Sequence, residues 1–211
     1  MDIDDSQRGE NPFDEPVRWL HASDPEAVAR KAGGRWEPGG SGEGFIVLPV
    51  LSGEVRVRFP DISVDAPEEL GSFSLKLLTL LYLSRSDGTR PSGKWVAYRE
   101  LQGGRFYEPV VKRSVEDPVA HKYATDPDGF LEACYAAGGR KESFGDASCS
   151  FELFPNALMT FILWRMDEEF PARVQVLFDS ESVRNLNAFD LRMGASEIAS
   201  KLLKWQKGEG G

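Results

Sequence analysis

The sequence predicts an α+β fold: a single domain of two pseudo-duplicated helix–GG–β-hairpin–helix halves with a mainly antiparallel sheet. The first observation is a repeated sextet, "AGGRWE" at 32–37 and "AGGRKE" at 137–142, which agrees at five of six positions. The second is that "ASDP" at 22–25 and "ATDP" at 124–127 precede the two copies at similar distances. Because the order is kept and the spacing changes little, the chain shows the pattern that a duplicated unit leaves.

Each half is expected to open with a helix. In the first half, Asp24 can cap a helix at 26–32, and Pro25 can occupy its first turn, where a missing N–H costs little. The second half repeats this pattern with a helix predicted at 128–137. The paired glycines then end each helix, because glycine tolerates the left-handed conformation that follows a last helical turn.

A pair of strands is predicted after each pair of glycines, at 45–59 and at 149–164. Residues 54–59 alternate between charged and apolar side chains, which is the period of a half-buried strand. Pro49 and Pro155 hold corresponding positions in the two copies and indicate an edge, a bulge or the turn itself.

Each half is predicted to close with a helix that begins at a glycine, Gly71 in the first half and Gly194 in the second. The halves then span about 16–92 and 118–205, with a central segment at 93–117 between them. The apolar helix after Gly71 carries leucines on nearly all sides, so we expect it to be the buried helix of the domain.

The central segment is predicted to add a strand at 94–101 and a turn at Gly103–Gly104. A helix at 109–122 should follow, disturbed at Pro118, since proline cannot donate a helical hydrogen bond.

Composition limits the class of protein. With 41% hydrophobic residues the chain can form a core, whereas 25 basic against 34 acidic residues give a net charge of −9, which disfavours nucleic acid and anionic membranes as partners. The N-terminal stretch lacks the basic and apolar regions of a secretory signal, so a cytoplasmic location is expected.

Cys134 and Cys149 alone cannot ligate an iron–sulfur cluster or a closed zinc site. Residues 1–15 and 206–211 are expected to be mobile tails.

The best candidate site lies in the central segment, where basic residues outnumber acidic ones although the chain as a whole is acidic. Arginine side chains beside aromatic rings suit a planar or phosphorylated anion. The alternative is that these basic residues pair with acidic groups elsewhere on the surface. The residues assigned to this ligand-binding site are Arg99, Glu100, Arg105 and Tyr107.

A second candidate is a set of carboxylates that could hold Mg²⁺ or Ca²⁺ or act as acid and base: Asp146, Asp167, Glu168 and Asp179. The alternative is that the acidic run is a solvated turn between two strands. Asp179 ends an apolar strand, and that position suits capping as well as ligation.

Three blocks of the chain carry a resemblance to a known family: "LLTLLYL" at 77–83, "GKWVAYRELQGGRFY" at 93–107 and "DEEFPARVQVLFD" at 167–179. Together they resemble domain-of-unknown-function family 3786, found in bacteria and archaea and frequent in anaerobes. The resemblance implies no known reaction. Some relatives carry an appended cysteine-rich iron–sulfur segment, which this chain lacks, and that puts direct redox chemistry in doubt.

Three functions from different classes follow. The favoured one is a non-catalytic binding or accessory protein for an anionic cofactor or metabolite whose identity the sequence does not give. It requires a concave pocket lined by the central segment. The alternative is a carboxylate-metal-dependent, hydrolase-like enzyme, which requires the four carboxylates to converge. The second alternative is a protein–protein interaction module, which requires an exposed apolar patch.

Overall fold

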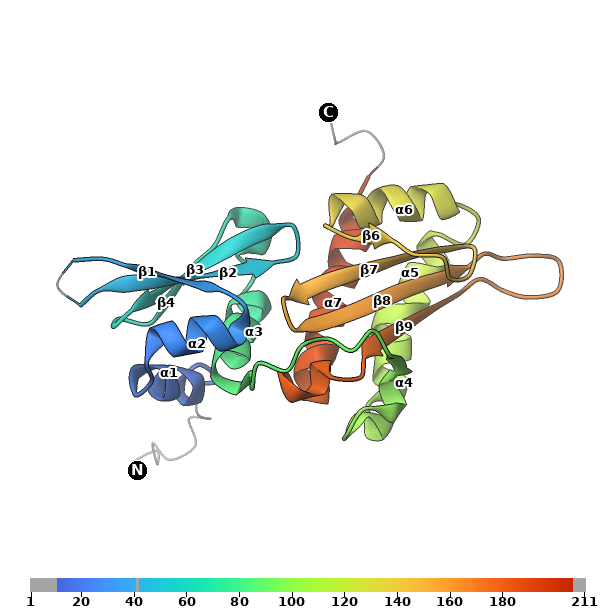
Figure 1. The fold of residues 1–211 in the computed structure, drawn as a ribbon. Helices are drawn as coiled ribbons and strands as arrows, with labels where there is room; N and C mark the ends of the chain where they lie inside the picture. The colour runs from blue at the N-terminus through green and yellow to red at the C-terminus, as the bar shows by residue number, and fades with distance from the viewer. Residues whose placement is uncertain (1–10, 41, 207–211) are drawn as a thin grey trace, which may run out of the picture.

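The computed structural model describes residues 11–40 and 42–206 and has two halves side by side, each with its own antiparallel sheet (Figure 1). The helices are α1 (Asp14–His21), α2 (Pro25–Ala32), α3 (Phe73–Arg85), α4 (Glu108–Val111), α5 (Asp117–Lys122), α6 (Pro127–Ala136) and α7 (Ala188–Lys204). The strands are β1 (Arg35–Pro38), β2 (Gly44–Val50), β3 (Gly53–Phe59), β4 (Ser63–Asp65), β5 (Trp95–Ala97), β6 (Arg140–Lys141), β7 (Ala147–Phe154), β8 (Ala157–Trp164) and β9 (Arg173–Asp179).

The strand order is β1-β2-β3-β4 in the first sheet and β5-β9-β8-β7-β6 in the second, so the α+β class with mainly antiparallel sheets is confirmed. The predicted hairpins are β2–β3 and β7–β8, and each is widened by a further strand on either side. Both halves run helix, four antiparallel strands, helix. This shared order agrees with the pseudo-duplication, which itself stays a prediction.

The helices that open the halves form as predicted. The Asp24 carboxylate accepts a hydrogen bond from the Glu26 amide at 3.2 Å, and Asp126 accepts one from the Gly129 amide at 2.9 Å. Gly33 and Gly138 then end α2 and α6 with φ angles of 74° and 87°. These are left-handed conformations that glycine adopts without a steric penalty.

The prediction that Gly194 opens the last helix is wrong. Helix α7 begins at Ala188, and the Asn187 side chain accepts a hydrogen bond from the Asp190 amide at its start. Gly194 is buried in the middle of α7, where a Cβ atom would lie 2.2 Å from a methyl carbon of Leu153. This glycine therefore lets α7 pack closely on β7. Helix α3 begins near the predicted Gly71, with Ser72 as its cap.

In the central segment, the predicted strand at 94–101 is too long. Strand β5 ends at Ala97 because the chain turns into a 3-10 helix at Tyr98–Glu100. The predicted helix at 109–122 is confirmed as α4 and α5 joined by the π-helical turn Lys112–Glu116. The π-helical turn precedes Pro118, and the wider π spacing is one way in which a helix accommodates a missing N–H.

The predicted tails fall mostly outside the described residues, which exclude 1–10 and 207–211. Helix α1 already begins at Asp14 and buries Pro16 and Leu20, so the folded domain starts earlier than position 16. Buried hydrophobic residues of both halves form one continuous core.

The two halves interlock through reciprocal contacts. The β7–β8 turn packs on the end of α2, where a Cβ atom on Gly33 would lie 2.7 Å from the Cβ of Pro155. The β2–β3 turn packs on the end of α6, where a Cβ atom on Gly138 would lie 2.8 Å from Ser52. Each hairpin turn thus rests on the glycine that ends the other half's helix.

Tyr82 of α3 lies between the halves and is fully buried. Its hydroxyl group donates to the Ala32 carbonyl at 2.9 Å and accepts from the Asn156 amide at 3.0 Å. Its ring stacks on Phe154 with centroids 4.4 Å apart. Asn185 extends this polar junction, because its side-chain amide donates to the carbonyl of Asn156 and its oxygen accepts from Ser86.

We predict that Gly33→Ala and Gly138→Ala each lower the free energy of unfolding by about 2–4 kcal/mol, because the added methyl group combines left-handed strain with a steric overlap on the other half. Gly93→Ala is the matched control: its φ is 76°, but nothing lies within 4 Å of the added carbon, so a loss of about 1 kcal/mol is expected. Urea denaturation of the three variants measures the difference. Equal losses would contradict the interlocking role of the two glycine caps.

Candidate ligand-binding site

A pocket of about 400 Å³ lies at the surface of the central segment, on the second half of the molecule. Three of the four residues assigned from the sequence line it, namely Arg99, Glu100 and Arg105. Phe106 completes the lining and is 88% exposed. The structure therefore brings both predicted arginines to one pocket.

Two glycines make this arrangement possible. Gly103 has a φ of 84°, and a Cβ atom on Gly104 would lie 1.8 Å from the Tyr98 carbonyl oxygen. The chain can therefore double back on the 3-10 helix, so that Arg99 and Arg105 line the same pocket. The motif "RELQGGRFY" thus encodes the shape of this loop.

Glu100 has a structural task within the same loop. Its carboxylate accepts a hydrogen bond from the Ala97 amide at 2.8 Å, which closes the turn where β5 ends. One carboxylate oxygen is therefore already occupied. Glu100 supports the pocket more than it offers a free charge to a ligand.

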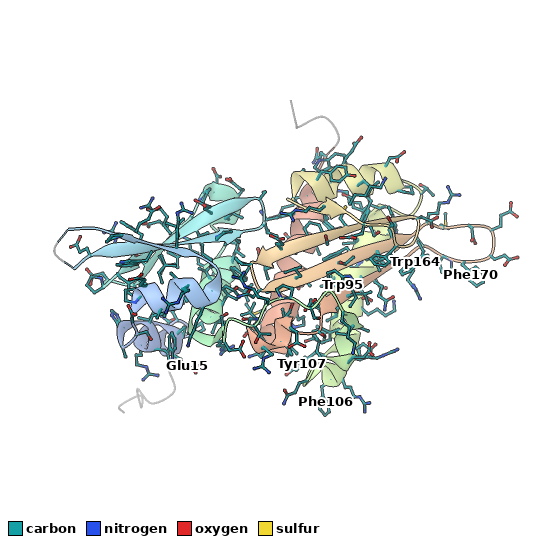
Figure 2. All side chains as sticks on the ribbon, in the orientation of Figure 1. Glu15, Trp95, Phe106, Tyr107, Trp164 and Phe170 are labelled. Atoms are coloured by element: carbon teal, nitrogen blue, oxygen red, sulfur yellow. The ribbon has the colours of Figure 1, made fainter. Side chains whose placement is uncertain are left out.

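The two arginines remain available to a ligand. Arg99 makes an ion pair with Glu108 at 3.6 Å, and both side chains are largely exposed, so the pair is weak. Arg105 makes no ion pair with any described residue. Tyr107, which is labelled in Figure 2, does not line the pocket. Its ring packs edge-on against Phe189, with ring centroids 6.1 Å apart.

The four predicted metal-binding carboxylates are not brought together. Asp146 and Asp167 line a separate pocket of about 510 Å³ at the β8–β9 connection, while Glu168 is exposed outside its lining. Among the described residues, no group of three or more His, Cys, Asp or Glu side chains is placed to hold a metal ion.

Asp146 and Asp167 cap backbone amides. Asp167 accepts from the Phe170 amide at 2.7 Å and from the Glu169 amide at 2.9 Å, and these bonds hold its pKa below the ordinary value. Asp146 accepts from the Arg165 amide at 2.9 Å. The acidic run is thus a self-capped turn between β8 and β9.

Asp179 is fully buried at the end of β9, far along the strand from the acidic run. Its carboxylate accepts from the amides of Gly93 at 2.6 Å, Ser92 at 3.1 Å and Glu181 at 3.0 Å. It therefore ties the linker between the halves to the sheet, which is a capping role.

A further cavity, of about 340 Å³, was not foreseen from the sequence. It lies between β9 and the π-helical turn and is lined by Lys112, Glu116 and Arg173 among others. Burial raises the pKa of Glu116, although its carboxylate accepts a hydrogen bond from the Val176 amide at 2.9 Å. The helical pattern places Glu116 on a helix, but it gives no sign of this contact.

The fold and pocket define a two-sheet α+β protein with an arginine-lined surface pocket. A family model described as a domain of unknown function, DUF3786, matches residues 24–200 of the 211-residue chain, and the chain belongs to this family. Neither curated proteins nor solved structures yield a match. Within the described residues, no helix has both the length and the apolar character needed to cross a membrane.

We predict that Asp179→Asn lowers the free energy of unfolding by about 1–3 kcal/mol, because Asp179 is buried and an amide NH₂ group cannot accept from the Ser92 or Gly93 amides. Asp167→Asn is the matched control, since this carboxylate also caps two amides but is solvent-exposed, and its loss should be smaller. Urea denaturation at neutral pH compares them. A larger loss for the exposed position would refute the assignment.

Proposed function

We propose that the pocket beside Gly103–Gly104 binds a small anion and that the protein is a non-catalytic binding or accessory protein for an anionic cofactor or metabolite. The observation that carries this proposal is that Arg99 and Arg105 line one pocket in a chain of net charge −9. Arg105 has no ion-pair partner among the described residues. In such a chain, a guanidinium group without a carboxylate partner is a site at which an anion gains a contact.

The chemistry of the lining suggests the class of ligand. Two guanidinium groups can offer paired N–H donors to a carboxylate or phosphate group, and the exposed ring of Phe106 offers an apolar face next to them. A negatively charged ligand with a planar or apolar part satisfies both features. The pocket volume of about 400 Å³ suits a small molecule.

The carboxylate-metal alternative has less support, because Asp146 and Asp167 share a pocket that neither Glu168 nor Asp179 lines. A hydrolytic metal site needs several oxygen ligands around one point, together with an open position.

We predict that the double variant Arg99→Ala/Arg105→Ala binds the anionic ligand at least about tenfold more weakly, because each charged hydrogen bond contributes roughly 1.5–3 kcal/mol. Native mass spectrometry of the purified protein measures the fraction that retains a small-molecule adduct, and calorimetric titration with citrate and with AMP provides defined probes. Arg140→Ala, which removes an exposed guanidinium group elsewhere, should leave retention unchanged. Equal retention by the double variant would eliminate this site.

A further inference from the structure

The cavity of about 340 Å³ lies apart from the pocket of Arg99 and Arg105, and the two share no lining residue. Helix α4 and the π-helical turn form one wall of this cavity, and β9 forms the opposite wall. Pro109, Lys112 and Arg173 line the cavity and are exposed, so it opens to solvent. Single π-helical turns are rare and occur frequently at functional sites. The cavity is therefore a second candidate for small-molecule binding.

The Glu116 carboxylate lines this cavity and has no ion-pair partner among the described residues. Its Oε1 atom accepts from the Val176 amide at 2.9 Å, whereas its Oε2 atom accepts no hydrogen bond from the described part of the chain. Burial raises the pKa of this carboxyl group. A half-buried carboxylate oxygen that has lost water gains free energy from an N–H donor, and most of all from a charged one. Glu116 therefore suits the ammonium group of a ligand.

Arg173 supplies the complementary charge on the wall formed by β9. Its guanidinium group lies 4.2 Å from the centre of the Trp164 ring and makes no ion pair with a described residue. The positive charges of Lys112 and Arg173 oppose the rise in the pKa of Glu116, but neither side chain forms an ion pair with it. Lys112 pairs with Asp117. Glu116 and Arg173 thus line one cavity as separated charges of opposite sign.

The charges of the cavity disfavour a ligand that carries only one kind of charge. A plain anion would meet the carboxylates of Glu108 and Glu116, whereas a plain cation would meet Lys112 and Arg173. A ligand with both an ammonium group and a carboxylate group can pair with each side. Repulsion of the singly charged ligands then adds to its specificity.

The remaining lining and the size of the cavity limit the ligand further. Pro109 and Val111 of α4 and Ala97 of β5 contribute apolar surface beside the charged groups. The volume of about 340 Å³ lies near the lower end of the range for small-molecule sites. One apolar side chain next to two charged groups matches this lining.

We propose that this cavity binds a free α-amino acid with an apolar side chain. The ammonium group of the ligand donates to the Oε2 atom of Glu116, and its carboxylate pairs with Arg173. The side chain of the ligand packs on Pro109 and Val111. This site is separate from the anion pocket, so the two proposals can fail independently.

The test is a calorimetric and NMR titration of the whole protein with L-valine, L-leucine, L-methionine and L-phenylalanine. We expect at least one of them to bind and to shift the Val176 amide resonance, because this amide donates to Glu116. Two analogues of the tightest ligand, one without the carboxylate and one without the ammonium group, should each bind at least about tenfold more weakly. For leucine these analogues are isoamylamine and isocaproate.

Glu116→Gln keeps a side-chain oxygen for the Val176 amide but removes the charge, so it should keep the fold and weaken binding at least about tenfold. Arg173→Gln, at an exposed position, should weaken binding to a similar extent. Glu132→Gln removes an exposed carboxylate on α6, away from the cavity. It is the matched control and should change binding less than about twofold.

The proposal would be overturned if none of the four amino acids bound at concentrations up to about 10 mM. Equal binding of either truncated analogue, or equal binding by the wild type and both cavity variants, would overturn it as well. Binding that Arg99→Ala/Arg105→Ala abolishes and Glu116→Gln keeps would also contradict it, because the amino acid would then occupy the anion pocket.

Discussion

The contact between the two halves rests on the buried hydroxyl group of Tyr82. It accepts from an amide of the second half and donates to a carbonyl of the first, so one polar group satisfies partners in both. Inside a core, such a bond is favourable chiefly because leaving either partner unpaired would be costly. Asn156, whose side chain also donates to the Lys31 carbonyl, adds a second link at the same point. These directional contacts specify how the halves meet, which apolar burial alone does not.

The difference between local structure and contacts across the two halves explains which parts of the fold could be predicted from the sequence. The repeated sextet revealed the helix ends correctly, because a left-handed cap is a local demand that glycine meets at any position. It did not reveal that the same glycines contact the opposite half. The role of Gly194 could not be predicted from the sequence either. Glycine is typical both of a helix boundary and of close packing such as that on Leu153, and the two cannot be distinguished without tertiary contacts.

The candidate sites, too, could be predicted only where the local sequence determines which residues come together. Arg99 and Arg105 could be assigned together because they are six residues apart and a glycine turn between them returns the chain. The four carboxylates span residues 146–179, and their convergence depended on the fold, which places Asp179 at the opposite end of β9 from the acidic run. The contact of Arg173 with the Trp164 ring was not predicted, although these residues lie opposite each other in the register of β8 and β9.

Charge pairing supports the placement of the proposed anion site in the central segment. On the open face of the first sheet, Arg35 and Arg56 are held by Glu37 and Glu54, so that face is internally neutralised. Arg105 of the central segment, by contrast, has no ion-pair partner among the described residues. The chain has 34 acidic and 25 basic residues, so a shortage of carboxylates does not explain why a guanidinium group has no ion-pair partner. It is available to an anion from outside the chain.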